Sequence, residues 1–257
     1  MLAVERQHRI LDMLLKSRAV TTARAAKVLA VSEETVRRDF EKLEADGHLS
    51  REHGGAVRIN DSRSDLPLDS RETANVAEKA AIARVALTQI QKGDTVFFDA
   101  SSTVFHLARL LANLEVTVLT NALKVAIELA RQPAVEVILA GGEVNHGSLS
   151  CQGTLADQML DSYHIQKAFM SCRGLDVERG LSEANAEQAG LKRKIIKLSD
   201  QNIVLADHTK LNLNSSYFFA KLGDVDTLIT DCQPGGAVKK VLQKGGVKLI
   251  LPKERTT

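Results

Sequence analysis

A basic, hydroxyl-bearing segment near the amino terminus has the chemistry needed to contact DNA. A helix is expected from Ser32, a favourable N-cap, to Gly47, which suits the residue after a helix end. Val36, Phe40 and Leu43 lie at spacings of four and three and would form its buried face. Arginine and lysine contact phosphates and guanine edges, and serine and threonine hydroxyls reach phosphate or base. The candidate DNA contacts on this helix are Ser32, Thr35, Arg37, Arg38 and Lys42.

Two further helical patterns and a hairpin would position that helix. Apolar residues form one stripe over residues 4–17 and another over residues 22–29, and residues 49–59 alternate loosely around Gly54 and Gly55. Three helices followed by a hairpin are the layout of a winged helix-turn-helix, whose third helix enters the major groove. On the hairpin, or wing, Arg51 and His53 would add hydrogen-bond donors.

The charge of this module leaves a second interpretation open. Residues 1–58 hold 11 Lys and Arg against 9 Asp and Glu, a net charge of +2. A helix that mixes both signs is usually a solvated surface, so a three-helix bundle with exposed ion pairs would show the same pattern. Attraction to DNA therefore requires that acids such as Glu33 and Glu34 be segregated from the arginines.

A second candidate site follows a predicted apolar strand at residues 95–99. The strand runs into a small, hydroxyl-rich turn of Ser101, Ser102 and Thr103, which opens a helix. Backbone N–H groups and hydroxyls at such a start can hold an anion, or one hydroxyl can simply cap the helix, and both alternatives stay open. The G-K-[ST] ending of a Walker loop is absent.

Polar residues after other predicted strands could complete this site, because ligands bind at the carboxyl ends of parallel strands. Lys210 could neutralise a phosphate, and Asp207 could accept hydrogen bonds from sugar hydroxyls. Asn121 could orient a ligand or merely cap the next helix. Gly141 and Gly142 follow another strand, but a glycine pair more often marks a tight turn.

The pattern along the chain predicts two domains. Residues 59–75 are polar, contain Pro67 and lack periodicity, so we expect a linker between a head at residues 1–58 and a body at residues 76–257. In the body, short β-rich runs alternate with amphipathic stretches, which is typical of a mainly parallel sheet with helices on both faces. The strands are expected at residues 95–99, 116–119, 135–139, 168–171, 203–206, 227–230 and 247–251. The helices are expected at residues 103–111, 123–130, 184–198 and 237–243.

Composition excludes several classes of protein. A net charge of +2 over 257 residues argues against a polycationic DNA coat, and Trp 0 with Tyr 2 argues against an aromatic platform for single strands. Cys151, Cys172 and Cys232 are widely separated and lie in no Cys/His cluster, so we predict no disulfide, zinc site or cofactor. Apolar runs fall far short of the ~20 residues that span a bilayer, and no signal-peptide pattern is present, so we expect a cytoplasmic protein.

Two specific motifs occur together in the head, and further motifs follow in the body. The head carries V-S-E-E-T-V-R-R-D-F at residues 31–40 and H-G-G-A at residues 53–56. The body carries D-A-S-S-T at residues 99–103, T-N at 120–121, G-G at 141–142 and A-D-H-T-K at 206–210. In this order and over nearly the whole chain, the motifs resemble the DeoR family of bacterial sugar-metabolism regulators.

The resemblance implies both partners and a fold. The helix at residues 32–47 would read an operator in double-stranded DNA, and the body would be similar to ribose-5-phosphate isomerase and CoA-transferase folds and would sense a phosphorylated sugar. The loop at residues 99–103 and Lys210 would hold the phosphate, with Asp99, Asn121 and Asp207 near the sugar and with Gly141 and Gly142 among the effector contacts. Ala100 and residues 170–173 depart from the commoner pattern and look more like fucose-operon regulators, a hint about the ligand.

The main alternative is an enzyme of the isomerase or CoA-transferase type. An isomerase would want a paired-aspartate turn, whereas residues 171–174 read Ser-Cys-Arg-Gly. A CoA-transferase would want a glutamate in an S-E-N-G-like turn, and residues 182–185 read Ser-Glu-Ala-Asn, an interrupted match. Glu183 and Glu187 would instead lie on the exposed start of a helix whose basic end is Lys192 to Lys194.

The sequence therefore predicts an α/β protein with an amino-terminal winged helix-turn-helix and a larger α/β sensor domain. We expect a regulator of a carbohydrate operon with no catalytic residue and no metal. Operators are usually met by symmetric oligomers, so we expect at least a homodimer.

Overall fold

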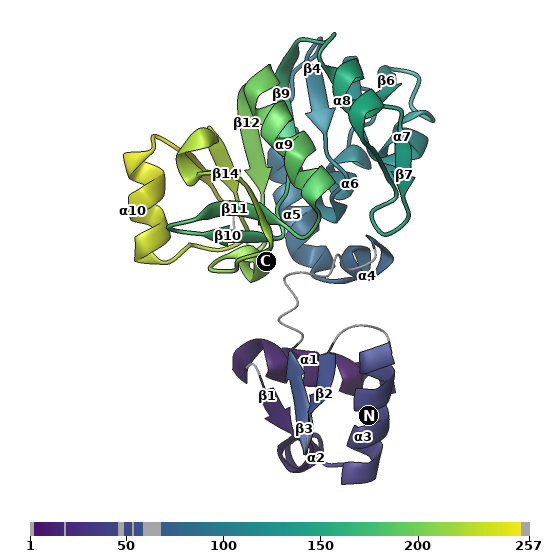
Figure 1. The fold of residues 1–257 in the computed structure, drawn as a ribbon, viewed down its shortest axis with the longest axis vertical. Coiled ribbons are helices and arrows are strands. Elements are labelled where there is room, and N and C mark those ends of the chain that lie inside the picture. Colours follow the sequence, from purple (N-terminus) through teal and green to yellow (C-terminus); the bar gives the residue numbers. More distant parts are fainter. Residues whose placement is uncertain (1–2, 18, 46–48, 53, 59–67, 253–257) are drawn as a thin grey trace. The chain divides into compact units, whose positions relative to one another are not determined.

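Figure 1 shows the computed structural model, which describes residues 3–17, 19–45, 49–52, 54–58 and 68–252. The chain divides into two compact units, residues 1–61 and residues 62–257. Each unit has its own hydrophobic core, and each is described here by itself.

The amino-terminal unit is a three-helix core with a small antiparallel sheet. Its elements are α1 (Ala3–Ser17), β1 (Ala19–Thr21), α2 (Thr22–Leu29), α3 (Glu33–Ala45), β2 (Leu49–Glu52) and β3 (Gly55–Arg58). The strands lie in the order β1-β3-β2, and β2 and β3 form the predicted hairpin. Val36, Phe40 and Leu43 are buried on α3, as their spacing predicts. The winged helix-turn-helix layout is thus confirmed, and β1 is an addition that the sequence did not reveal.

Two side-chain caps set the angle between α2 and α3. The Oγ1 of Thr21 accepts a hydrogen bond from the backbone N of Arg24 at 3.2 Å, and the Oγ of Ser32 accepts one from the N of Thr35 at 3.2 Å. Between these helices, Ala30 adopts a left-handed conformation with φ of 54°. Because the caps satisfy backbone donors that would otherwise lack partners, they define where each helix begins.

A buried ion pair joins the first and third helices. The guanidinium of Arg6 donates to both carboxylate oxygens of Asp39, with Nη2 to Oδ1 at 3.0 Å, and the side chains are only 14% and 5% exposed. The hydrogen bond to Asp39 raises the pKa of Arg6 above its usual value. Asp39 lies within the R-R-D run of the DNA-contact helix, yet it faces inward and fixes α3 against α1.

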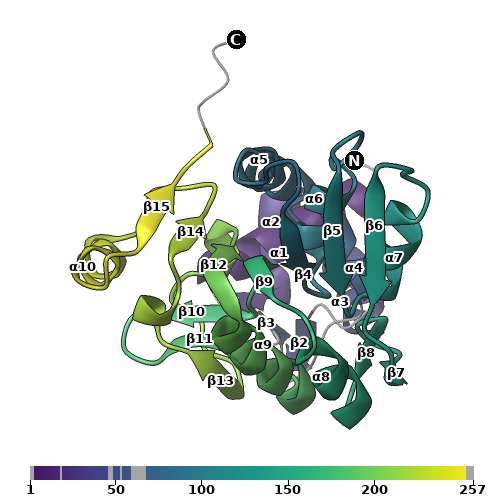
Figure 2. The same ribbon diagram turned by 90° about the horizontal axis from the view of Figure 1, so that it is seen from above.

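The second unit is built on a seven-stranded sheet in which all neighbouring strands are parallel. In the order β15-β14-β12-β9-β4-β5-β6, the strands are Lys248–Ile250, Thr227–Ile229, Ser199–Leu205, Ile165–Met170, Thr95–Phe98, Val116–Thr120 and Val135–Leu139. These are the seven strands expected from the sequence, with ends that differ by up to four residues. The parallel sheet is confirmed (Figure 2).

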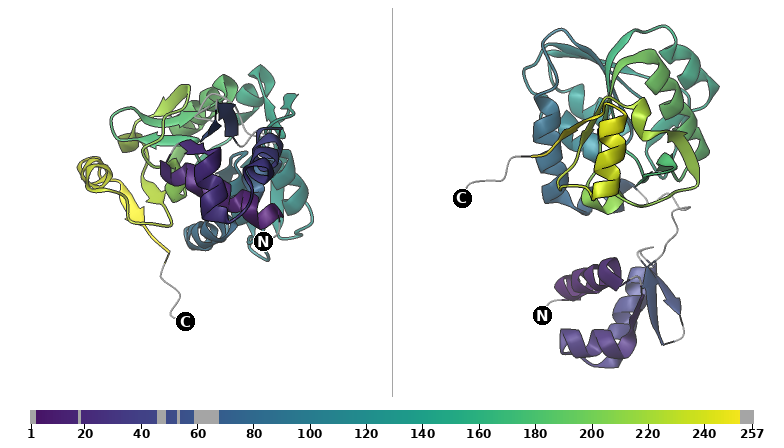
Figure 3. Two further views of the ribbon diagram at one scale, coloured as in Figure 1. Left: turned by 90° about the horizontal axis from the view of Figure 1, so that it is seen from below. Right: turned by 90° about the vertical axis from the view of Figure 1, so that its left-hand side faces the viewer.

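Helices cover both faces of this sheet. Successive residues of a strand point to opposite faces, so Phe98 packs into the core beneath α5 (Val76–Leu87), α6 (Ser102–Ala108) and α7 (Leu123–Leu129). Phe97 packs on the other side, beneath α8 (Thr154–Leu160) and α9 (Ala186–Leu198). Figure 3 shows helices on opposite sides of the strands in its right-hand view. In the part of the chain that the structure describes, no helix is both long and apolar enough to cross a membrane.

Two small sheets and a last helix complete this unit. The strands β7 (Glu143–Asn145) and β8 (Ser150–Gln152) form a hairpin, and β10 (Gly174–Asp176), β11 (Gly180–Glu183) and β13 (Tyr217–Ala220) form a second antiparallel sheet. This unit also contains α10 (Gly236–Lys244) and single 3-10 turns at His208–Lys210 and Leu222–Asp224.

The predicted linker needs a correction over its carboxyl-terminal half. Within residues 59–75, the helix α4 (Leu68–Thr73) packs on the second unit, and residues 59–67 lie outside the described part of the chain. The N of Leu68 donates to the carbonyl of Gly147 at 2.9 Å, and Lys124 bonds Asp69 at 2.7 Å and Glu72 at 2.9 Å. These long-range partners were invisible in a segment that has no apolar periodicity.

Replacement of Asp39 by Ala should destabilise the amino-terminal unit by about 2 kcal/mol, because the buried Arg6 guanidinium would lose both acceptors. Urea unfolding combined with hydrogen exchange of the α3 amides measures the change. The matched control is Glu5→Ala, which removes the exposed Glu5–Arg9 pair at 3.5 Å and should cost less than about 0.5 kcal/mol. Equal effects of the two substitutions would contradict the structural role of Asp39.

Candidate functional site

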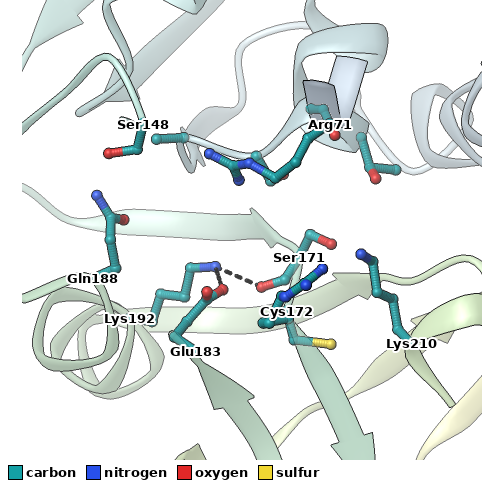
Figure 4. A pocket seen from close by; sticks show the side chains of 13 residues that line it. Arg71, Ser148, Ser171, Cys172, Glu183, Gln188, Lys192 and Lys210 are labelled. Atoms are coloured by element: carbon teal, nitrogen blue, oxygen red, sulfur yellow. Dashed lines mark hydrogen bonds and ion pairs between the residues drawn. The ribbon is translucent and has the colours of Figure 1, made fainter. Parts of the chain in front are cut away.

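A polar pocket opens at the carboxyl edge of the parallel sheet, above β4, β9 and β12 (Figure 4). The loops after these three strands supply residues 100–103, residues 171–173 and Lys210. The other lining residues are Arg71 of α4, Ser148 of the β7–β8 hairpin, Glu183 of β11, and Gln188 and Lys192 of α9. Ligands bind at this edge of open α/β sheets, so the position fits a binding site.

The predicted hydroxyl loop contributes to this pocket. Ser101, Ser102 and Thr103 all line it, and all three are buried. Ser101 also caps α6, because its Oγ accepts a hydrogen bond from the N of Val104 at 3.2 Å. The two alternatives for this turn are therefore compatible, since one hydroxyl caps the helix while the loop as a whole faces the pocket.

Asp99 lies beneath the pocket and does not line it. The residue is fully buried, and its Oδ1 accepts from the N of Ser101 at 3.1 Å. Its Oδ2 accepts from the N of Ser171 at 2.8 Å and from the Nζ of Lys192 at 2.8 Å. Both of its oxygens hold protein groups, so Asp99 positions the loops on β4 and β9. Its expected place near the sugar stays a prediction.

Lys192 is a buried cation that the sequence placed on an exposed helix end. Its ammonium reaches Asp99, the carboxylate of Glu183 and the carbonyl of Ser171, the last at 2.6 Å. Burial lowers the pKa of Lys192, but its two carboxylate partners outweigh that effect and the net shift is upward. Lys192 therefore carries its charge at neutral pH and ties three chain segments together at the pocket floor.

A group of cations lies on the other wall of the pocket. Lys210 and Arg173 follow β12 and β9, and Arg71 reaches in from α4. Burial lowers the pKa of Lys210, and the charges of Arg173 and Arg71 lower it further, against the opposing effect of Asp207. Lys79 of α5, which donates to the carbonyls of Arg71 and Ala74, has a pKa lowered to about 8, mainly by burial. Lys210, Arg173 and Arg71 are thus the cations that line this wall, and Lys79 contacts Arg71 from outside the pocket lining.

Four more predicted effector residues, besides Asp99, lie outside the pocket lining. Gly141 and Gly142 follow the edge strand β6, which is separated from β9 by β5 and β4, and a Cβ on Gly142 would lie 2.5 Å from the carbonyl oxygen of Gln152. Asn121 is buried, and its Nδ2 donates to the carbonyl of Cys151 at 3.1 Å. Asp207 is buried, and its Oδ1 accepts from the N of Thr209 at 2.9 Å.

These four residues consequently have structural roles that the geometry defines. The glycines form the tight turn into the β7–β8 hairpin, Asn121 holds that hairpin to β5, and Asp207 caps the 3-10 turn that carries Lys210. The part of the glycines and Asn121 as direct effector contacts stays a prediction. Asp207 acts on the site through its charge near Lys210.

The sequence missed the pocket residues that come from outside the strand ends. Arg71 stood in the presumed linker, Ser148 in an unassigned hairpin, and Gln188 and Lys192 on a helix taken as exposed. Glu183 was noticed only for its partial match to an enzyme motif. One available signal was the position of Lys192 on α9 between the apolar Leu191 and Ile195, which lie on the buried face.

Cys172 also lines the pocket, where burial raises the pKa of its thiol to about 12. A thiol with so high a pKa carries almost no thiolate at neutral pH and is a poor nucleophile. The side chain belongs to the same buried cluster as Leu175 and Leu181.

The candidate DNA contacts on α3 form an exposed surface, but the acids are not segregated from the arginines. Arg37 lies 3.4 Å from Glu33 and 3.5 Å from Glu34, and Arg38 lies 3.4 Å from Glu34. Arg37 and Arg38 are 57% and 77% exposed. Exposed pairs of this kind are weak, about 0–1 kcal/mol each, so a phosphate can displace the carboxylates.

The remaining head residues differ in their surroundings. Lys42 is exposed, Ser32 and Thr35 share a hydroxyl contact at 2.9 Å, and Arg51 bonds Glu41 at 2.7 Å and Glu44 at 2.9 Å. Arg51 therefore holds β2 to α3, and its part as a DNA contact stays a prediction. His53 lies outside the described residues.

Two solved structures show a partial likeness to the chain. One is a ribose 5-phosphate isomerase A from Methanocaldococcus jannaschii, with a TM-score of 0.41 and 18% identity over 54% of this chain and 55% of that one. The other is eIF2B beta from Chaetomium thermophilum, with a TM-score of 0.42 and 14% identity over 60% of this chain and 48% of that one.

Among curated relatives, the chain is 41% identical to the uncharacterized HTH-type transcriptional regulator YulB of Bacillus subtilis, over 97% of this chain and 96% of the relative. It is 35% identical to the HTH-type transcriptional repressor GlcR of Bacillus subtilis, over 97% and 96%. It is 33% identical to the L-fucose operon activator of Escherichia coli, over 88% and 94%. The fucose relative is no more similar than the others, so the hint of a fucose ligand stays untested.

Two family descriptions match the two units of the chain. The DeoR-like helix-turn-helix domain matches residues 6–62, and the DeoR C terminal sensor domain matches residues 74–232. The boundary between the matches falls near the division between the two compact units. The chain therefore belongs to the DeoR family of transcriptional regulators, in which a DNA-binding helix-turn-helix is joined to a sensor domain, and it is a regulator and not an enzyme.

Proposed function

We propose that this protein regulates a carbohydrate operon and that a phosphorylated sugar in the pocket switches its binding to operator DNA. The observation that carries the proposal is the composition of the pocket wall. Arg71, Arg173 and Lys210 converge there beside the hydroxyl loop at residues 101–103. Arginine, lysine and hydroxyl groups together are the donors that bind phosphate monoesters.

The lowered lysine pKa values support an anionic ligand. The pKa of Lys79 is about 8 and that of Lys210 is also lowered, in both cases through burial and neighbouring cations. Such a site holds more positive charge than its own carboxylates offset, since Asp207 is the opposing charge near both lysines. A dianionic phosphate would remove this excess, and the same lysines would then be more fully protonated.

The helix α4 offers a route from the pocket to the head. Arg71 lies on α4 and lines the pocket, and the N of Leu68 bonds the carbonyl of Gly147, next to the pocket residue Ser148. The chain runs from α4 through residues 59–67 to the head. A ligand that contacts Arg71 differently in two arrangements of α4 would shift the balance between them, which is the thermodynamic requirement for a switch.

We also propose that the protein acts in the cytoplasm as a homodimer or larger oligomer on a symmetric operator. This fits the helix-turn-helix head, because two such heads read half-sites related by symmetry. The named relatives include both a repressor and an activator, so they do not decide the direction of regulation.

The substitution Arg38→Ala should weaken binding to an operator fragment at least about tenfold, because a 77% exposed guanidinium on α3 would no longer reach DNA. Fluorescence anisotropy with the DNA flanking the gene, at two salt concentrations, measures the loss. The control Arg84→Ala makes the same charge change on an exposed position of α5 and should bind within twofold of wild type. Unchanged affinity of Arg38→Ala would remove Arg38 from the contact set.

The substitution Lys210→Met should reduce the affinity for inorganic phosphate and for sugar phosphates at least about tenfold, since the pocket loses a converging cation. Operator binding without effector should stay within twofold of wild type. Isothermal titration calorimetry and the anisotropy assay test the two expectations. The control Lys248→Met lies on β15 at the far edge of the sheet, and a loss of the same size there would show that net charge alone is responsible.

Phosphate binding should weaken as the pH rises above about 8, because Lys79 loses its proton near that pH when the pocket is empty. The charged groups that act on Lys79 are Asp207, Lys210, Arg71 and Glu72. A bound anion raises the pKa of Lys79, so binding at pH 8.5 should take up protons, and affinity should fall by about threefold or more between pH 7.5 and 9.

Calorimetry of phosphate binding at pH 8.5 in two buffers of different ionisation enthalpy measures that proton uptake. The variant Lys79→Met should take up fewer protons than wild type, and the remainder would report Lys210, whose pKa is also lowered. Binding of phosphate without any proton exchange would contradict an excess of positive charge on this wall.

A further inference from the structure

The pocket has two ends with opposite hydrogen-bonding character. Lys210 lies at one end in Figure 4, and the guanidinium of Arg71 lies between the two ends. Ser148, Gln188 and Glu183 lie toward the other end, with the ammonium of Lys192 beside Glu183. The cationic end presents the ammonium of Lys210, whereas the second end contains the carboxylate that lines the pocket. A ligand must therefore present different groups to the two ends.

Glu183 presents an acceptor to the pocket. Its Oε1 accepts a hydrogen bond from Lys192, and among the described residues no other donor contacts the carboxylate. Lys192 is itself shared with the fully buried Asp99, so one ammonium faces two carboxylates. The side chain of Glu183 is 14% exposed, and Asp99 is 0% exposed. The single positive charge of Lys192 therefore cannot neutralise both carboxylates, and the remaining negative charge is accessible from the pocket at Glu183.

A directional chain of hydrogen bonds occupies the hydroxyl protons of Ser148 and Ser150 and one of the two amide protons of Gln188. Ser148 donates its hydroxyl to the Oδ1 of Asn145 at 3.1 Å. The contact between the Oγ atoms of Ser148 and Ser150, at 2.8 Å, then requires Ser150 to donate, because a hydroxyl has one proton. The Nε2 of Gln188 donates to the Oγ of Ser150 at 2.6 Å. The amide oxygen of Gln188 is left to face the pocket as an acceptor (Figure 4).

We propose that Glu183 and Gln188 form an acceptor subsite that selects a ligand by its hydroxyl groups and rejects a second anionic group. The proposal rests on the function proposed above, with the phosphate at Lys210. The ligand class is then a phosphate monoester with hydroxyls on the carbon chain at the opposite end, such as an aldose or alditol phosphate. A phosphorylated sugar acid would place its carboxylate against Glu183, where like charges in a partly dehydrated site repel.

The test compares matched ligand pairs on the full-length protein. Isothermal titration calorimetry would measure glucose 6-phosphate against 6-phosphogluconate and ribose 5-phosphate against 5-phosphoribonate, with inorganic phosphate as the probe of the cationic end alone. In the wild type, the aldose phosphate of the better-binding pair should bind at least about tenfold more tightly than its acid.

The variant Glu183→Gln should reverse this selection. It keeps an acceptor for Lys192 and the side-chain volume but removes the repulsive charge, so the preference for the aldose phosphate should shrink to less than about threefold, mainly through tighter binding of the acid. The affinity for inorganic phosphate should change by less than about twofold. The matched control Glu187→Gln removes an exposed carboxylate from the first turn of α9 and should retain the wild-type preference.

A second variant protects the test against a folding defect in Glu183→Gln, which thermal unfolding would reveal. Gln188→Glu adds a carboxylate to the acceptor subsite and should increase rejection of the sugar acid. An unchanged preference in both variants, or a wild type that prefers the acids, would overturn the subsite. Failure of the wild type to bind phosphate or any of these ligands would instead overturn the proposed effector site, and the subsite with it.

Discussion

The sensor unit depends on one buried cation. Lys192 is 3% exposed, and its ammonium joins Asp99 after β4, the carbonyl of Ser171 after β9 and Glu183 on β11. Removing an ammonium from water costs several kcal/mol unless charged and polar partners surround it, so the cluster forms only when these segments are in register. The same contacts that offset this cost place the loops on β4 and β9 at a fixed separation. The pocket above them is the space that this separation leaves.

The residues at the floor of the pocket determine how charge and hydrogen-bond acceptors are distributed over its walls. Both carboxylate oxygens of Asp99 accept hydrogen bonds from protein groups. Glu183 also bonds Lys192, but its carboxylate lines the pocket and can accept further hydrogen bonds there. Burial lowers the pKa of Lys210 on the cationic wall, and the charge of Arg173 lowers it further. An uneven distribution of partners around one lysine thus gives the site a cationic wall and an acceptor end. A ligand that is anionic at one end and hydroxylated at the other satisfies both.

The sequence predicted the elements that have a periodic apolar pattern, and it missed the positions of side chains that depend on partners distant in the chain. All seven central strands were found, because buried parallel strands read as short apolar runs, and the head was found from the stripe on α3. The strands β7, β10 and β11 have three or four residues and lack such runs, and the apolar run of β13 was left unassigned. Glu183 was assigned to the exposed start of a helix and Lys192 to its basic end, because nothing in their spacing shows Asp99, which lies some ninety residues away. The residues at strand ends were placed at the correct edge, but which of them reach the ligand depends on their partners.

Because the electrostatic attraction between the head and DNA is weak, a modest coupling between the pocket and the head would be sufficient to change DNA binding. Arg37 and Arg38 face Glu33 and Glu34 at 3.4 to 3.5 Å, so each contact with a DNA phosphate must first displace a carboxylate. The net attraction of a unit with a charge near +2 is small, and in the proposed oligomer affinity would rest on the fit of two or more heads to one operator. Coupling free energies between sites are typically about 1–3 kcal/mol, too little to dissociate a strongly cationic protein from DNA. Coupling free energies of this size are enough when the electrostatic attraction between the heads and DNA is small. Such a coupling would begin at α4, which is anchored by Lys124 and places Arg71 in the pocket lining.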